Sequence, residues 1–475
     1  MGSAMAEPDD YQGAAGTNYF ETDSLVHRLV SDVTPQDRRE AVLEELSSLG
    51  ASCGGKLSSL IETAHKDENK PRLEGNRVVY CREQVEARRQ AMDAGLLPPV
   101  SITERMTKAY LLNQNGEGGI TCPLAMTDGL VALLEARGTE EQKNRYLPLL
   151  RDSSVDTPLT AGQFVTERQG GSNVSENETR AVQQPDGTWK LSGVKWFCSN
   201  PGDLWVTTAK PEGRDAVGLF LVPRVKPDGS LNTHKLTGLK DLSGTYGKAT
   251  AEVEYDGTYA ESIGRPSHGL AILLRTVLKT SRVHVAAASL GFGRRALVEA
   301  MGWAQGRVVL GKPVGELPHV KATLAEMQTR QQGATLAVYR MFSALEAGDP
   351  SAEVLVPLLK IGVSRDASRQ VREARLLFGG SGTVRDFSIL PRLSEDALIQ
   401  EIWEGTHPIL AGHALKALRR EPSREAFLSI LPDDIANLLS ERLGDHDDSE
   451  AVSVCEHAYQ SLTTSLLRSW ELTTG

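Results

Sequence analysis

The chain has 475 residues, of which 40% are hydrophobic and 24% charged, a length sufficient for about three domains of ordinary size. Its 62 acidic and 52 basic side chains give a net charge of −10, which disfavours a nucleic-acid-binding protein, because phosphate backbones attract clustered Lys and Arg. No window approaches the roughly 18–20 consecutive apolar residues of a membrane span, and the five scattered cysteines form no C-x-x-C pair. We therefore expect a cytoplasmic protein without a disulfide scaffold or zinc ribbon.

The first third of the chain predicts a mainly helical domain. Residues 1–20 begin with a segment that resembles an expression tag and continue with small and polar residues, so we expect them to be disordered. Apolar residues then recur at helical spacing through residues 21–156. Within this range Thr139 and Gln142 have the spacing of a capping box, which begins a helix directly after Gly138. We assign residues 21–156 to an N-terminal helical domain.

Residues 157–262 predict a β domain. Six segments either alternate between apolar and polar residues or are rich in β-branched and aromatic residues, and Gly-containing turn signals separate several of them. The segments are Leu159–Thr166, Arg180–Gln184, Trp189–Phe197, Leu204–Ala209, Gly218–Pro223 and Ala249–Tyr255. Because these strands follow one another without helices between them, we expect an antiparallel barrel or sandwich rather than a parallel sheet.

Helical periodicity returns after the strands. Over residues 263–420, apolar side chains such as Leu317, Val320 and Leu324 mark one face of a long helix. Residues 421–475 form an acidic helical tail, in which eleven acidic and three basic side chains give a local charge of about −8 that repels phosphate backbones. The predicted fold class is α+β, mainly α, with helical, β and helical domains in that order.

The common nucleotide and metal motifs are missing from the sequence. The Gly-Lys pairs at Gly247 and Gly311 lack the Ser or Thr that follows in a P-loop, and the Gly-Phe-Gly at Gly291 lies in a helical pattern rather than after a strand. The ten histidines include no H-x-x-x-H pair. We therefore expect neither a P-loop nor a Rossmann site, and no catalytic metal.

Two segments contain residues suited to chemistry. The first, Phe164–Asn173, leads from a strand into a glycine turn, where backbone N–H groups can approach a flat polar ring or a phosphate; the alternative is an ordinary turn. In the second, Glu404 lies between Trp403 and Gly405 near the end of a helical block. An apolar setting would raise the pKa of this carboxylate, as a base for a weak carbon acid requires. The alternative is an exposed glutamate beside a helix break.

From about Thr103 to Arg420 the chain resembles the acyl-CoA dehydrogenase family of flavoproteins, and within it the AidB-like branch. The similarity is carried, in the order and spacing of the family, by Gly138–Pro148, Thr166–Ser172, Lys195–Phe197, Ser281–His284, Arg307–Gly311, Phe378–Gly382 and Trp403–Thr406. The resemblance implies N-terminal helices, a middle antiparallel β-barrel and a C-terminal four-helix bundle. FAD would lie between barrel and bundle, and its adenine end would reach a neighbouring subunit, where Gly379 and Gly380 let the backbone approach it. The resemblance also implies a homodimer or homotetramer.

The resemblance further implies a catalytic role for Glu404. This carboxylate would remove the α-proton of an acyl thioester, while the β-hydrogen leaves as hydride to flavin N5. The Glu404 backbone N–H would help to stabilise the enolate. Arg282 would lie close to the base and the substrate carbonyl, and the alternative for Arg282 is a structural ion pair inside the bundle. Ser172 and Gly405 would also lie near the substrate.

The residues that the resemblance implies in FAD binding come from both the predicted β domain and the predicted C-terminal bundle. Thr166 and its strand would contact the pyrimidine edge of the flavin, and Trp196 would pack near its ring. Either Cys198 or Ser199 would face N5, depending on whether the strand carries a bulge. The implied set is Phe164, Thr166, Gly171, Ser172, Trp196, Cys198, Ser199, Arg307 at the diphosphate, His319, Gly379, Gly380 and Thr406.

Three functions remain as hypotheses. The leading one is dehydrogenation of an acyl-CoA or acyl-carrier-protein thioester, with an electron-transfer flavoprotein as the expected acceptor. Departures from the common family pattern at Leu376, Pro408 and Lys279 keep the carrier-protein thioester open. The others are an AidB-like nucleic-acid-associated flavoprotein, which the acidic tail disfavours, and a flavin oxidase on the same scaffold. We expect neither nucleic acid nor a membrane as a partner.

Overall fold

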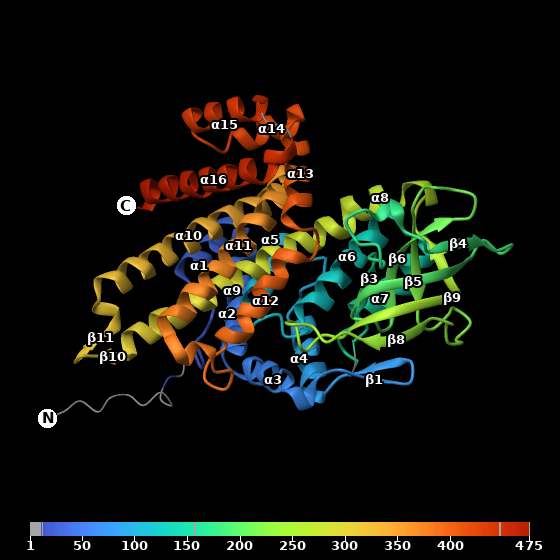
Figure 1. Cartoon of the computed structure of the whole chain (residues 1–475), viewed down its shortest axis with the longest axis horizontal. Helices are drawn as coiled ribbons and strands as arrows, with labels where there is room; N and C mark the ends of the chain where they lie inside the picture. Colours follow the sequence, from blue (N-terminus) through green and yellow to red (C-terminus); the bar gives the residue numbers. More distant parts are fainter. Residues whose placement is uncertain (1–10, 12, 156–157, 446–447, 475) are drawn as a thin grey trace. The chain divides into compact units, whose positions relative to one another are not determined.

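The computed structural model describes residues 11, 13–155, 158–445 and 448–474. The chain divides into two compact units. The barrel unit contains residues 59–100 and 117–281, and the helical unit contains the residues up to 58, residues 101–116 and those from 282 onward. Helix α9 (Leu278–Gly306) carries the chain from the first unit into the second (Figure 1).

The barrel unit is built on a seven-stranded sheet that closes on itself. The strand order is β3-β6-β4-β5-β9-β7, β8 pairs with β9, and an additional pairing of β6 with β7 closes the barrel. The strands are β3 (Ala161–Phe164), β4 (Arg180–Gln183), β5 (Trp189–Ser199), β6 (Leu204–Pro211), β7 (Gly218–Pro223), β8 (Lys235–Leu239) and β9 (Thr250–Ser262). The unit also holds the hairpin of β1 (Arg72–Glu74) and β2 (Arg77–Val79), most of α3 (Lys56–Ala64), and helices α4 (Arg82–Asp93), α6 (Thr121–Arg137), α7 (Glu140–Arg151) and α8 (Gly269–Ile272).

The predicted β domain is confirmed, with two differences. All six predicted strands are present, but β8 was not predicted. In addition, β3 and β4 each pair with β6 in parallel, whereas the other pairs of the barrel are antiparallel. Parallel partners cannot be joined by a tight turn, so these two pairings connect strands that are not neighbours in sequence and leave no local signal.

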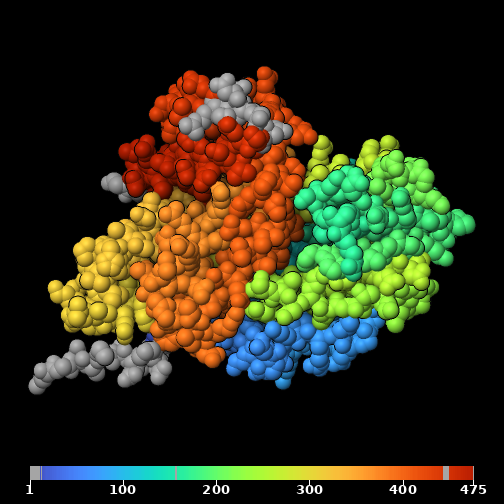
Figure 2. Space-filling view, viewed as in Figure 1, coloured from blue at the N-terminus to red at the C-terminus, as the bar shows by residue number. Residues whose placement is uncertain are grey.

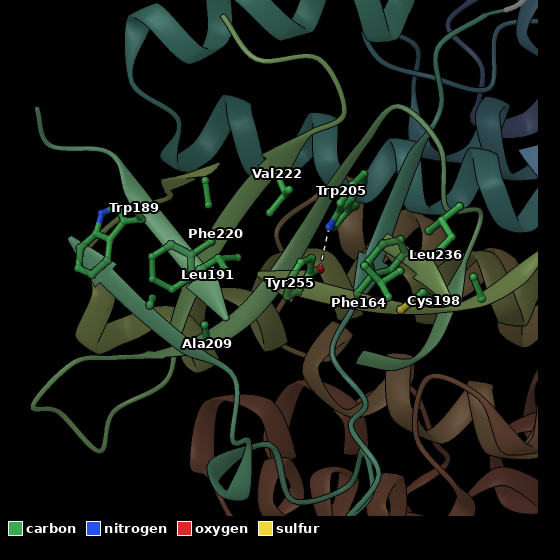
Figure 3. Packing of buried hydrophobic residues seen from close by; sticks show 14 of the residues in the cluster. Phe164, Trp189, Leu191, Cys198, Trp205, Ala209, Phe220, Val222, Leu236 and Tyr255 are labelled. Atoms are coloured by element: carbon green, nitrogen blue, oxygen red, sulfur yellow. Dashed lines mark hydrogen bonds between the residues drawn. The ribbon is translucent and has the colours of Figure 1, made fainter. Parts of the chain in front are cut away.

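The barrel core gathers several of the chain's few aromatic residues (Figure 3). The Phe164 ring stacks on Trp205 with centroids 5.2 Å apart. Trp205 Nε1 donates a hydrogen bond of 2.9 Å to the hydroxyl of Tyr255, which satisfies polar atoms of two buried rings at once. Cys198 belongs to the same buried cluster.

A buried ion pair links β5 to the segment that follows β3. Lys195 Nζ lies 2.6 Å from Glu167 Oε1, and both side chains are almost completely buried. The Glu167 carboxylate also accepts hydrogen bonds from the backbone N–H groups of Glu178 and Thr179. Burial lowers the pKa of Lys195 to about 8, and for Glu167 burial, which raises the pKa, is outweighed by Lys195 and the hydrogen bonds, which lower it. Both residues belong to segments that carry the family resemblance.

The helical unit is organised around the long helices of a bundle. Helix α11 packs against α10, α12 and α13, and α16 packs against α10 and α13. Helix α10 begins at Pro318, which is tolerated in a first turn, and α11 is followed by Gly379 with φ of +61°. The helices are α1 (Ser24–Val33), α2 (Gln36–Gly54), α5 (Ile102–Asn113), α10 (Pro318–Glu346), α11 (Ala352–Phe378), α12 (Leu390–Ile402), α13 (His407–Leu418), α14 (Glu421–Leu428), α15 (Asp433–Asp445) and α16 (Ala451–Thr474), with most of α9.

The acidic C-terminal segment is helical and packs on the bundle. Its helix α16 packs against α10, α11 and α13, and in the space-filling view the red part of the chain adjoins the orange part (Figure 2). The Tyr459 hydroxyl of α16 lies 2.5 Å from Asp366 Oδ2 of α11. A Cβ on Gly362 would lie 2.3 Å from the Tyr459 ring, so this close approach requires glycine.

Three further searches of the described residues bear on function. None of the helices placed there is long and apolar enough to cross a membrane. The same residues contain no group of three or more His, Cys, Asp or Glu side chains that could hold a metal ion. The five cysteines, all of them in the described part of the chain, are not joined in disulfide bonds.

The ion pair of Lys195 and Glu167 leads to a stability prediction. Replacing Lys195 with Met leaves a buried carboxylate without its cation, and we expect a loss of about 3–5 kcal/mol in the free energy of unfolding, measured by urea titration. The double variant Lys195→Met with Glu167→Leu removes both charges and should recover part of this loss, because the backbone N–H groups of Glu178 and Thr179 lose their acceptor. If Lys195→Met alone loses less than about 1 kcal/mol in the free energy of unfolding, the ion pair behaves like a solvent-exposed one.

Candidate active site

The predicted base Glu404 lies in a short turn between two helices. Helix α12 ends at Ile402 and α13 begins at His407. Glu404 has a φ of +57° and Gly405 a φ of +105°. A non-glycine residue in the left-handed region is uncommon, and such strained positions cluster at functional sites.

Two cationic side chains hold the backbone around this turn. Arg282 of α9 donates from Nε to the carbonyl of Glu404 at 3.0 Å. Lys360 of α11 donates from Nζ to the carbonyls of Gly405 at 2.8 Å and Glu401 at 3.1 Å. The last carbonyls of a helix have no donors within it and form the negative end of its dipole, so a cation is well placed at the end of α12.

Burial governs the ionisation of the groups beside Glu404. It lowers the pKa of Lys360 to about 7, although the charge of Glu404 acts in the opposite direction. Burial also lowers the pKa of Arg282, again against the effect of Glu404. The pKa of His407 falls to about 4 through burial and the charge of Lys360, so this ring is neutral near pH 7. One carboxylate oxygen of Glu404, Oε2, is shielded from solvent. The turn therefore combines a shielded carboxylate with two cationic side chains.

A cavity of about 710 Å³ in the helical unit is lined by Arg307, His319 and Gly380. These residues come from the end of α9, the start of α10 and the segment after α11. Trp303 and Phe378 form an aromatic wall with ring centroids 4.6 Å apart. Three of the residues predicted for the nucleotide end of FAD thus line one cavity.

The lining of this cavity fits a nucleotide diphosphate. The Arg307 guanidinium can pair with phosphate oxygens, and aromatic and apolar walls suit an adenine ring. A Cβ added to Gly379 or Gly380 would meet no other atom within 4 Å, so a ligand can approach the backbone there. Thr406, also predicted for this end of FAD, is exposed at the N-cap position of α13.

In the barrel unit, a bulge decides which way the side chains at the end of β5 point. The pairing of β5 with β9 shifts register between Lys195 and Cys198, and both side chains point into the barrel. The Cys198 thiol is completely buried in the core, where burial raises its pKa above the usual range. Ser199 is only partly buried, and its hydroxyl contacts Lys248 Nζ at 2.8 Å. The structure therefore leaves Ser199, not Cys198, on the outer surface of the strand.

The other predicted residues of the barrel unit gather near the segment after β3. Trp196 donates its backbone N–H to the carbonyl of Thr166 at 2.8 Å. A Cβ on Gly171 would lie 2.4 Å from Thr166 Oγ1, so the turn needs glycine at this point. Ser172 is exposed. The Phe164 side chain is completely buried in the barrel core, so only its backbone could face a ligand.

Two residues of interest were not predicted as site residues. Phe197 is a large aromatic side chain with 46% of its surface exposed, two residues before Ser199 on the same side of β5. Lys360 is a single charged residue in a run of apolar helical residues. An isolated lysine in such a run was the available signal, because long apolar faces rarely contain an unpartnered charge.

Comparisons with known proteins place the chain in a family. Two family models match it: acyl-CoA dehydrogenase, middle domain, over residues 162–257, and acyl-CoA dehydrogenase, C-terminal domain, over residues 267–418. Acyl-CoA dehydrogenase family member 11 of Caenorhabditis elegans is 30% identical over 461 residues, which are 89% of this chain and 73% of that protein. Putative acyl-CoA dehydrogenase AidB of Escherichia coli (strain K12) is 30% identical over 344 residues, 68% of this chain and 63% of that protein.

Solved structures agree with this assignment. Caenorhabditis elegans ACDH-11 in complex with C11-CoA is 26% identical and has a TM-score of 0.88, covering 98% of this chain and 90% of that chain. An acyl-CoA dehydrogenase of Bacillus anthracis complexed with FAD, 17% identical, has the same fold with a TM-score of 0.75, covering 97% of this chain and 86% of that chain. The chain therefore belongs to the acyl-CoA dehydrogenase family of oxidoreductases.

Proposed function

We propose that this protein oxidises an acyl thioester between its α and β carbons, with FAD as cofactor and Glu404 as the base that removes the α-proton. The observation that supports this most is the Glu404 turn, which combines a strained backbone, a carboxylate oxygen shielded from solvent and two adjacent cations. Membership of the family supports the reaction class. The Caenorhabditis elegans relative was solved with an acyl-CoA, C11-CoA.

In the proposed reaction the α C–H bond breaks and its proton passes to the Glu404 carboxylate. The electron pair left on the α carbon forms the double bond, and the β-hydrogen leaves with its own electron pair. FAD, when bound, supplies the two-electron acceptor for that hydride. Thioester α-protons are weakly acidic, so the base must be ionised before the step and shielded from water during it. The Glu404 backbone N–H would donate to the thioester carbonyl and stabilise the enolate charge.

Arg282 would position the Glu404 turn beside the substrate. Its hydrogen bond to the Glu404 carbonyl orients the turn rather than the carboxylate. Gly405 follows directly with a φ of +105°, a conformation that favours glycine, and a Cβ there would also lie 3.1 Å from the Leu410 side chain. Ser172 remains a proposed substrate contact from the barrel unit.

Each unit has its own residues suited to FAD. In the helical unit, Arg307 would pair with the diphosphate, and His319, Gly379 and Gly380 would surround the adenine end, with Thr406 as an additional hydroxyl. In the barrel unit, Thr166 and Ser199 would offer hydroxyls to the flavin, and Phe197 and Trp196 would offer aromatic surface. We propose Ser199 rather than Cys198 for the N5 contact, because the thiol lies in the barrel core and is a weak donor.

We propose acyl-CoA as the form of the substrate, a homodimer or homotetramer as the assembly, and an electron-transfer flavoprotein as the electron acceptor. A carrier-protein thioester is the alternative substrate. Anaerobic titration with acyl-CoA and acyl-carrier thioesters, followed by the visible absorbance of the flavin, tests between them. A nucleic-acid-associated role has less support, because the C-terminal helices carry the acidic charge of residues 421–475.

The base assignment predicts the behaviour of Glu404→Gln. We expect this variant to retain FAD but to reduce its flavin about 10²–10⁴-fold more slowly than wild type, because an amide cannot accept the α-proton. Anaerobic stopped-flow mixing with C11-CoA measures the rate. Glu395→Gln is the matched control: Glu395 lies in α12, which precedes the turn, and pairs with Arg385 at the surface, so this variant should react like wild type. Equal rates for Glu404→Gln and wild type would remove Glu404 from the mechanism.

The cavity beside Arg307 predicts a cofactor-binding defect. Arg307→Ala removes a charge-assisted contact to the diphosphate, and we expect FAD affinity to fall about 10–100-fold. FAD is first removed from the protein, and the dissociation constant is then measured by titrating the cofactor-free protein with FAD. Arg340→Ala is the control, because Arg340 pairs with Asp349 away from the cavity. An Arg307→Ala protein that binds FAD as tightly as this control would contradict the diphosphate assignment.

A further inference from the structure

We propose that Lys360 is a positioning residue for the catalytic turn: from α11 it fixes the backbone on both sides of Glu404. The inference rests on the proposed role of Glu404 as base. It assigns a function to a buried lysine outside the segments that carry the family resemblance.

The partners of Lys360 distinguish it from other buried lysines. Lys108 and Lys195 are almost completely buried and pair with glutamate carboxylates, and the buried Lys248 donates to the hydroxyls of Ser199 and Thr250. Lys360 is equally buried, yet in the described part of the chain its hydrogen bonds go to two backbone carbonyls, of Gly405 and Glu401. Burying an amine is costly, and an apolar side chain would fill the same volume at less cost. We therefore infer that the role of this buried lysine is to bind the two carbonyls.

The two carbonyls that Lys360 binds lie on either side of the proposed base in the sequence. The Glu401 carbonyl belongs to the last turn of α12, and the Gly405 carbonyl follows the strained residue. Arg282 holds the carbonyl of Glu404 between them. Side chains of α9 and α11 bind all three carbonyls, so the backbone of Glu404 keeps its left-handed conformation. The Glu404 side chain therefore extends from a fixed backbone position. Without Lys360, Glu404 would be able to relax toward the common backbone regions.

The anchor does not depend on the charge of Lys360. An ammonium has three N–H donors and a neutral amine two, so both forms can serve two carbonyls. The charged groups that face Lys360 are Glu404 in the turn, Arg282 on α9 and Glu401 on α12, while His407 on α13 is neutral near pH 7. When protonated, Lys360 also stabilises the Glu404 anion, so its removal should move the acid limb of the pH–rate profile to higher pH.

The test compares full-length, FAD-loaded wild type with Lys360→Met. We expect Lys360→Met to bind C11-CoA about as well as wild type but to reduce its flavin about 10–100-fold more slowly, because small misplacements of a catalytic group have effects of this size. The acid limb of its pH–rate profile should lie at higher pH. Lys108→Met is the matched control, because it also loses two hydrogen bonds of a buried lysine, to Glu104 and Glu45, and should keep the wild-type rate and profile.

A second readout does not need activity. Hydrogen exchange of the peptide spanning residues 401–407 should be faster in Lys360→Met than in wild type or Lys108→Met. Wild-type flavin reduction together with wild-type exchange in Lys360→Met would overturn the inference. If the acyl-CoA and acyl-carrier thioesters of the anaerobic titration reduce wild type and Glu404→Gln equally, or reduce neither protein, the proposed function fails, and the exchange data still decide the role of Lys360. Lys360→Leu serves the same comparison if the Met variant does not fold.

Discussion

The geometry of the candidate site depends on the hydrogen bonds that connect Arg282 and Lys360 to the carbonyls around Glu404. These three residues are far apart in the sequence and meet because α9, α11 and the α12–α13 junction pack in one helical unit. A turn at the end of a helix would otherwise expose its carbonyls to water. Here protein donors replace that water, as the proposed role of Glu404 as a base for a carbon acid requires.

Much of the fold could be predicted from local pattern. The strand Gly218–Pro223 has the predicted bounds, and the capping box of Thr139 and Gln142 is present at the start of α7. Such features depend on residues a few positions apart. The parallel pairing of β3 with β6 depends instead on closure of the barrel, and β8 contains Gly238 in a short strand with a register shift, which weakens its pattern.

The candidate site was predictable where a motif fixes the geometry and not where packing does. Glu404 stood out because of its neighbours Trp403 and Gly405, and Arg307 was indicated by the family resemblance. The orientation of Cys198 depended on a bulge in β5, which reverses the alternation of the strand and is invisible in its composition. Lys360 follows no motif at all, and its importance appears only when the two carbonyls it binds are traced to the turn of α12 and α13.

The proposed base Glu404, with one carboxylate oxygen shielded from solvent, must meet two opposing requirements, and the placement of Arg282 and Lys360 answers both. Burial disfavours the carboxylate anion and so makes it more basic, whereas nearby positive charge keeps it ionised before the reaction. The hydrogen bonds of Arg282 and Lys360 go to backbone carbonyls rather than to the Glu404 carboxylate. Neither cation therefore competes directly with a proton for the carboxylate oxygens. The same bonds also fix the backbone from which that carboxylate extends, so one arrangement sets both the charge and the position of the base.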